Sequence, residues 1–183
     1  MSLACFHCSE PVPPGLELSV SVDGAPRPVC CPGCRAVTQL ILSSGHADYY
    51  RYRTAPALRP AEPAAADAWT AFDRPQAQAA FVHQVSAERA EAGFVVEGLS
   101  CAACAWLIES QLTRLPGLIE VRVSPATGRV QLAWRPAELK LSELLGTLAA
   151  LGYRPHPIAA DARAAATRER HNALKRLVVA GLG

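Results

Sequence analysis

The chain has 183 residues, of which 50% are hydrophobic and 19% are charged, and its formal net charge is +2. This length can bury a core, but it fits two small domains better than one. The small net charge and the 6% aromatic content argue against a nucleic-acid-binding protein. Cysteine is the informative residue: there are seven, and six form three close C-x-x-C pairs, which suits reduced, metal-binding thiols better than a disulfide framework.

Residues 1–45 hold five of the cysteines around a predicted hairpin. Residues 16–22 alternate between apolar and polar, Asp23-Gly24 is typical of a type I′ turn, and a helix is expected over residues 35–42. A segment of this size buries little apolar surface, so a bound metal would supply folding free energy that it otherwise lacks. We therefore expect a small Cys-rich domain of the zinc-ribbon or treble-clef type.

The cysteine spacing in this segment predicts a four-thiolate Zn(II) site, because a C-x-x-C, a hairpin-length spacer and a second C-x-x-C at a helix start are typical of such sites. The favoured ligands are Cys5, Cys8, Cys31 and Cys34. Cys31 is preferred to Cys30 because only Cys31 completes the second C-x-x-C. Cys30 is left as a core residue, a substitute ligand or part of a copper-binding variant of this site, and His7 is expected at the surface.

Residues 46–91 are rich in Ala and Pro, which predicts a stiff linker. Its second half contains a short predicted helix, with Asp73 placed as the N-cap before Arg74-Pro75. The aromatic residues around this helix indicate that one side packs on a neighbouring element.

Residues 92–158 alternate between strand and helix signals, which predicts an α+β domain. The hydrophobic period changes from 2 to 3.6 and back in the order strand, helix, strand, strand, helix, strand. This order is that of the ferredoxin-like βαββαβ fold, an antiparallel sheet with two helices on one face. The expected elements cover residues 94–96, 105–115, 119–123, 130–134 and 141–151, with Tyr153 opening the last strand.

Cys101 and Cys104 lie where the first strand of this domain turns into its first helix. Free backbone N–H groups and the positive end of the helix dipole favour thiolates there. Two thiolates without a carboxylate or histidine select Cu(I), whereas Zn(II) requires four ligands. The alternatives are a thiol-disulfide oxidoreductase that uses this pair, and a zinc-organised interaction module in which both Cys zones are structural.

Residues 159–183 predict a basic helix that enters an apolar run at residues 177–183. Positive residues before an apolar run are typical of the cytoplasmic flank of a membrane helix, here a truncated first transmembrane helix. A soluble helix with a frayed end is the alternative. The first residues lack a secretory signal, so we expect a cytoplasmic N-terminus.

Residues 96–109, which include Cys101-Ala-Ala-Cys104, together with Leu151-Gly-Tyr153 resemble a heavy-metal-associated domain of copper-transporting P-type ATPases. The Cys-rich zone and residues 72–76 and 173–183 are similar to the branch that supplies copper for cbb-type cytochrome oxidase assembly. One departure is Leu99, where many such domains have Met; since that residue usually packs, the loop should be preserved.

This resemblance implies a cytoplasmic N-terminal region that receives Cu(I), from a copper chaperone, and delivers or senses it for an ATP-driven efflux pump. The implied partners are the chaperone, the remainder of the ATPase and, through the C-terminal end, the inner membrane, at whose cytoplasmic face the chain would lie. The family's catalytic motifs would lie beyond Gly183, so this chain should bind copper without pumping it.

Overall fold

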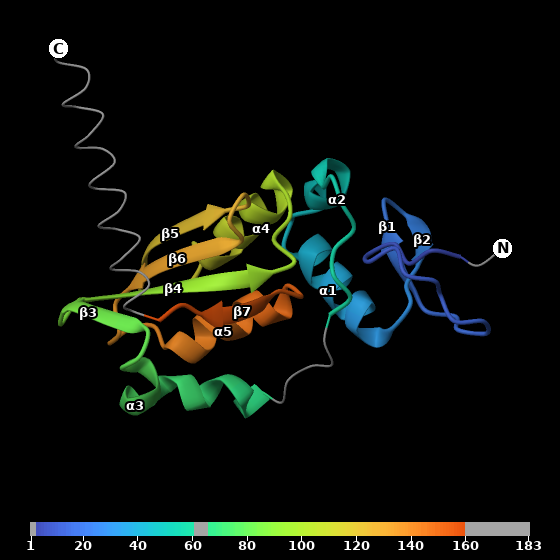
Figure 1. Ribbon diagram of the computed structural model, residues 1–183. Helices are drawn as coiled ribbons and strands as arrows, with labels where there is room; N and C mark the ends of the chain where they lie inside the picture. The colour runs from blue at the N-terminus through green and yellow to red at the C-terminus, as the bar shows by residue number, and fades with distance from the viewer. Residues whose placement is uncertain (1–2, 61–65, 160–183) are drawn as a thin grey trace, which may run out of the picture.

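The computed structural model describes residues 3–60 and 66–159, which form two α+β parts (Figure 1). We call residues 3–60 the N-terminal domain and residues 66–159 the C-terminal domain. No helix within the described ranges has the length and hydropathy needed to cross a membrane. The basic helix and apolar end expected at the C-terminus lie outside the described residues, apart from residue 159.

The N-terminal domain is a two-stranded hairpin followed by two helices. Asp23 and Gly24 join the strands with φ angles of 50° and 78°. These positive values are those of a type I′ turn, so the expected hairpin is confirmed. The elements are β1 (Ser19–Val22), β2 (Ala25–Pro28), α1 (Pro32–Ser43) and α2 (Asp48–Tyr52).

The C-terminal domain contains the expected ferredoxin-like order of elements. Strand β4 lies between β6 on one side and β7 on the other, β6 also pairs with β5, and every pairing is antiparallel. Helices α4 and α5 pack against each other and on the sheet. The bounds are β4 (Arg89–Glu97), α4 (Ala102–Leu112), β5 (Leu118–Ser124), β6 (Arg129–Trp134), α5 (Leu141–Ala150) and β7 (Arg154–Pro157).

A fifth strand, β3 (Val82–Ser86), extends this sheet. It pairs with residues 89–92 of β4, and β7 pairs with residues 94–97 along the same edge. Both β3 and the start of β4 fall within residues 46–91, the segment expected to be a linker. Four of the five residues of β3 are exposed, which explains why no hydrophobic alternation marks it in the sequence.

The first part of the expected linker forms α2 of the N-terminal domain, and its middle part packs on α5. This middle part forms η1 (Ala66–Asp73) and α3 (Pro75–Gln78), and η1 contacts α5. Asp73 does not cap α3, whose N-cap is Arg74 with no side-chain hydrogen bond. Instead, the Asp73 carboxylate accepts hydrogen bonds from the backbone N–H (2.9 Å) and hydroxyl (2.7 Å) of Ser142, in the first turn of α5.

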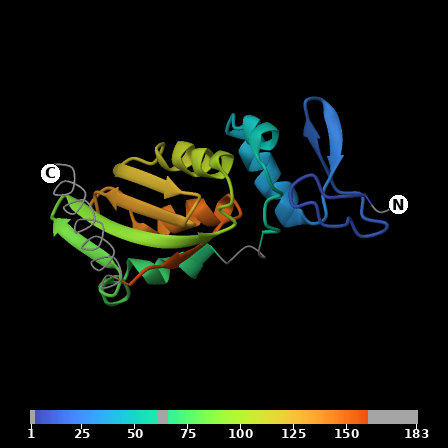
Figure 2. The ribbon, with the colours of Figure 1, turned by 45° about the horizontal axis from the view of Figure 1, so that its top comes forward.

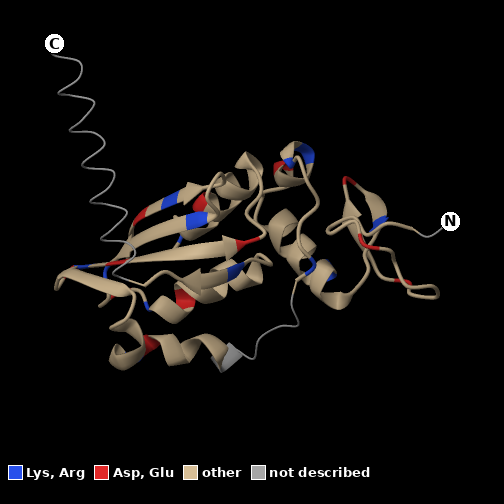
Figure 3. Ribbon diagram, in the orientation of Figure 1, with Lys and Arg blue, Asp and Glu red and all other residues tan. Residues whose placement is uncertain are grey.

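The N-terminal domain packs against the end of the sheet at which β4 leads into α4 (Figure 2). Val37, Ile41 and Tyr49 belong to the same hydrophobic cluster as the core of the C-terminal domain. Polar contacts border this interface: Gln111 Nε2 lies 2.9 Å from His46 Nδ1, and Arg114 donates to the carbonyl of Ser44 at 3.0 Å. Acidic and basic residues are interspersed along the described chain (Figure 3).

Candidate metal sites

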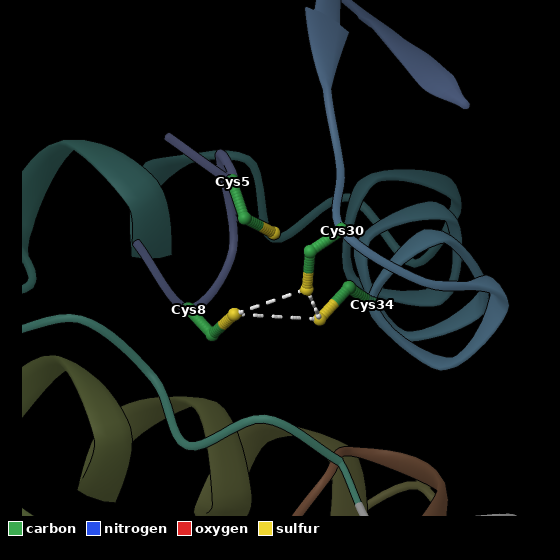
Figure 4. Close-up of side chains that lie close together, drawn as sticks. All are labelled: Cys5, Cys8, Cys30 and Cys34. Atoms are coloured by element: carbon green, nitrogen blue, oxygen red, sulfur yellow. Dashed lines mark hydrogen bonds between the residues drawn. The ribbon is translucent and has the colours of Figure 1, made fainter. Parts of the chain in front are cut away.

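Four cysteine sulfurs converge between the N-terminal loop and the start of α1 (Figure 4). The Sγ atoms lie within 4.8 Å of one another. Those of Cys8, Cys30 and Cys34 are 3.5, 3.6 and 3.7 Å apart, and all four residues are buried. We call this set the tetracysteine cluster: Cys5, Cys8, Cys30 and Cys34.

The spacing of these sulfurs suits one tetrahedral ion. A Zn–S bond of about 2.3 Å places tetrahedral thiolate sulfurs roughly 3.8 Å apart. The separations of 3.5 to 3.7 Å among the Cys8, Cys30 and Cys34 sulfurs are close to this value. The donor set is therefore suited to Zn(II) in a closed site, in which all four positions are taken by protein.

The fourth member of the tetracysteine cluster is Cys30, whereas the spacing of the cysteines in the sequence favoured Cys31. Cys31 is instead the N-cap of α1, and its sulfur accepts from the backbone N–H of Cys34 at 3.4 Å. Cys30 is almost completely buried, whereas Cys31 is half-buried. The structure brings together three of the four favoured ligands, Cys5, Cys8 and Cys34. The fourth candidate ligand is Cys30, for which the sequence leaves the role of substitute ligand open.

The electrostatics of the cluster favour a bound cation. Burial, together with the neighbouring thiols, raises the pKa of Cys30 to about 12 and raises that of Cys34 as well. For Cys5, burial opposes ionisation, but hydrogen bonds from the backbone of Cys8 and other neighbours lower the pKa to about 7. Four adjacent thiols release their protons together only when a positive ion compensates their charge.

His7 is buried beside the cluster, contrary to its expected surface position. Its Nδ1 lies 2.9 Å from the hydroxyl of Tyr50, and its Nε2 has no hydrogen-bond partner among the described residues. Burial and the nearby Arg53 guanidinium lower its pKa to about 4. Arg53 also donates to the carbonyls of Phe6 and His7, which fixes the loop that carries Cys5 and Cys8.

The second pair of thiols begins α4. Cys101 is the N-cap, and its sulfur accepts from the backbone N–H of Cys104 at 3.4 Å. The two Sγ atoms are 3.0 Å apart, and both cysteines are free thiols. Leu99 is buried under the loop, as the sequence predicted for this packing position.

Neighbouring side chains favour the ionised form of Cys104. Burial opposes ionisation, but hydrogen bonds from Cys101, the backbone of Ser100 and Tyr153 outweigh it, so the pKa of Cys104 falls below the usual 9.0. The Tyr153 hydroxyl is buried and makes no hydrogen bond of normal length, although it lies beside the Cys104 thiol and Tyr49. Two adjacent sulfurs without a carboxylate or imidazole form a soft, two-coordinate donor set.

Sequence reasoning missed the two tyrosines at this site. The sequence places Tyr153 at the start of the last strand, and Tyr49 falls in a short run of basic and aromatic residues, 48–53, that predicts packing or surface contact. In the structure Tyr49 is 2% exposed and belongs to the same buried cluster as Tyr153, Cys101 and Cys104. The signal in the sequence was that Tyr49 is a large aromatic residue in a short helix. Such a residue is expected to pack, but the sequence does not identify the residues on which it packs.

Comparisons with known proteins give two family matches. Residues 4–86 match the family described as "Putative metal-binding domain of cation transport ATPase", and residues 94–154 match the heavy-metal-associated domain. The copper-exporting P-type ATPase of Bacillus subtilis is 36% identical over 72 residues, which are 39% of this chain and 9% of that protein. The zinc-transporting ATPase of Synechocystis is 38% identical over 58 residues, or 32% of this chain and 8% of that protein.

Among solved structures, the N-terminal domain of a potential copper-translocating P-type ATPase from Bacillus subtilis, in the Cu(I)-loaded state, is 33% identical. It covers 38% of this chain and 86% of that one, with a TM-score of 0.36. The chain thus spans less than a tenth of the length of the curated relatives that it matches.

Proposed function

Because this chain joins a heavy-metal-associated domain to a metal-binding domain of cation-transport ATPases, we propose that it binds Cu(I) at Cys101 and Cys104 and delivers or senses it for such an ATPase. The observation that carries this proposal is the pair of adjacent sulfurs at the start of α4. The copper-exporting relatives support the choice of Cu(I), and the zinc-transporting relative makes Zn(II) the alternative cargo.

The donor set favours Cu(I) over Zn(II) at this pair. Two thiolates are available there, and the Ser100 hydroxyl lies 3.9 Å from the Cys104 sulfur. Zn(II) binds stably with four ligands, whereas a soft monovalent ion is satisfied by two sulfurs. A two-ligand site also accepts a third thiolate from a partner, so the ion can leave by ligand exchange.

The tetracysteine cluster has a different proposed role. Its four buried sulfurs would hold Zn(II) as a structural ion, since they leave no open position for exchange. The ion would join the N-terminal loop to the start of α1 and so contribute to folding of a domain with a small core. The proposed partners are a copper chaperone and the remainder of the ATPase, at the cytoplasmic face of the inner membrane.

The test is metal competition on the reduced full chain. The protein is loaded anaerobically with Cu(I) and Zn(II) together, and bound metal is measured after desalting. We expect one equivalent of each ion in the wild type. The Cys101→Ser/Cys104→Ser variant should lose copper alone, because the tetracysteine cluster does not involve these residues.

Each other outcome has a definite meaning. Copper retained by the double variant would reject Cys101 and Cys104 as the site. Zinc at both sites of the wild type would replace Cu(I) by Zn(II) as the cargo. No metal at this pair, combined with insulin reduction above the rate of a free dithiol, would favour thiol-disulfide exchange between the adjacent sulfurs.

A further inference from the structure

The Cys101–Cys104 pair is enclosed even though it lies in a loop at the end of the sheet. Cys101 is 6% exposed and Cys104 is 2% exposed. Loop thiols that exchange a metal with another protein need a path to solvent. The contacts that close this path therefore bear on how the site works.

The N-terminal domain supplies these contacts. Tyr49, in α2, is 2% exposed and belongs to the same buried cluster as Cys101, Cys104 and Tyr153, and α2 contacts α4. Leu58 lies over the loop before the cysteines, where a side chain at Gly98 would meet both Leu58 and Tyr153.

The second loop at this end of the domain, between α5 and β7, is covered as well. Val37 of α1 and Pro60 lie against Gly152, the residue before Tyr153. The N-terminal domain thus covers both loops that flank the two sulfurs.

From this arrangement we infer that the N-terminal domain covers the Cys101–Cys104 site and that Tyr49 holds α2 in place over it. A partner or chelator therefore reaches the thiols only after α2 has moved. The buried hydroxyl of Tyr153 lies beside the Cys104 thiol and Tyr49. This inference rests on the proposed function, because the process that the cover would limit is the exchange of Cu(I) bound at Cys101 and Cys104.

The border of the interface suits a cover that opens. Its polar contacts at the C-terminal end of α4 are the Gln111–His46 and Arg114–Ser44 hydrogen bonds, and Arg114 is exposed. A hollow of about 380 Å³ between α2 and the start of α4 is lined by Asp48, Tyr52, Ala102, Ala103 and Trp106. It reaches the two alanines between the cysteines, but both sulfur-bearing residues stay buried, so α2 still has to move before a partner contacts the thiols.

The experiment measures alkylation of individual cysteines by iodoacetamide in the native, reduced, zinc-loaded chain, followed by peptide mass spectrometry. In Tyr49→Ala, and separately in Gln111→Ala/Arg114→Ala, Cys101 and Cys104 should react about tenfold faster than in the wild type, because local opening becomes easier. Arg51→Ala is the matched control. Arg51 is on the same helix, but its side chain is 74% exposed and does not line the hollow, so its removal should leave the rate unchanged.

The tetracysteine cluster serves as an internal control for folding. If its cysteines also react faster in Tyr49→Ala, that variant has lost the N-terminal fold, and the Gln111→Ala/Arg114→Ala variant decides, because it leaves α2 intact. Unchanged rates at Cys101 and Cys104 in that variant, or an equal increase in Arg51→Ala, would overturn the inference.

A second readout separates this inference from the proposed function. Removal of bound Cu(I) by bicinchoninate should accelerate in the same variants, while the amount of copper bound at the start stays the same. Failure of the proposed function would appear as absence of copper from every protein with the alkylation difference intact. Copper bound with no difference in either rate would reject the cover alone.

Discussion

At the scale of the residue, the two C-x-x-C motifs that begin helices share one local geometry. Cys31 and Cys101 are both N-caps, and each sulfur accepts from the backbone N–H three residues later at 3.4 Å. In the C-terminal domain the capping cysteine also faces its partner thiol, at 3.0 Å. In the N-terminal domain the residue before the cap, Cys30, faces the other thiols instead.

This geometry predicts different effects for the two adjacent cysteines. Cys30→Ser should release zinc from the reduced chain, because it removes one of four converging sulfurs. Cys31→Ser should retain it, because a serine hydroxyl also caps a helix. Zinc content after dialysis measures both. Loss of zinc from Cys31→Ser with retention in Cys30→Ser would restore the ligand set favoured by the spacing.

The spacing of the cysteines predicted that four thiols gather, but not whether Cys30 or Cys31 is the one that faces the other three. Adjacent side chains at a helix start point in different directions, and the direction depends on the cap geometry. The same limit applies to His7, which sequence reasoning placed at the surface. Its burial depends on Tyr50 and Arg53, both more than 40 positions away in the chain.

At the scale of the element, the ferredoxin-like order was predictable because its strands and helices each bury one regular face. Periodicity reports such a face directly. It could not report β3, which is mostly exposed, or the partner of Asp73, which caps a helix 69 positions further along. A cap supplied from a distant element leaves no local pattern.

The Asp73 contact predicts a stability effect that crosses elements. Asp73→Ala should lower the free energy of unfolding by about 1 kcal/mol, the typical value for loss of a helix N-terminal cap. Chemical denaturation followed by circular dichroism measures the change. In a double-mutant cycle with Ser142→Ala the two effects should be less than additive, since the side chains share one hydrogen bond of 2.7 Å. Full additivity would contradict the contact.

At the scale of the whole molecule, helices α1 and α2 join the apolar core of the C-terminal domain, whereas the tetracysteine cluster belongs to a second apolar core. Tyr49 and Tyr50, adjacent on α2, face opposite domains: Tyr49 the Cys101–Cys104 site, and Tyr50 the His7 ring and Thr38. No sequence pattern predicts such docking, because each contact is made by single residues from short elements. Through Tyr49 and Tyr50, one turn of α2 therefore connects the surroundings of the tetracysteine cluster to the Cys101–Cys104 site.

Metal removal should affect the two domains unequally. A zinc chelator should increase hydrogen exchange in α1 and the N-terminal loop, because the cluster ion joins these segments. Amides within α4, α5 and β6 should stay protected, since their core is formed by buried aliphatic side chains. Unchanged exchange in α1 after zinc loss would show that the N-terminal domain folds without the ion.

The shared edge of β4 sets where the C-terminal domain can be excised. The heavy-metal-associated match starts at residue 94, but β3 pairs with residues 89–92 and is placed by family matching in the other domain. A fragment that starts at residue 94 would lack β3 and residues 89–93 of β4, and so leave residues 131–134 of β6 without their partners on that side. Exposed edges of this kind recruit strands from other molecules. A monomeric excised domain should therefore begin before Val82, inside the stretch that sequence comparison assigns to its neighbour.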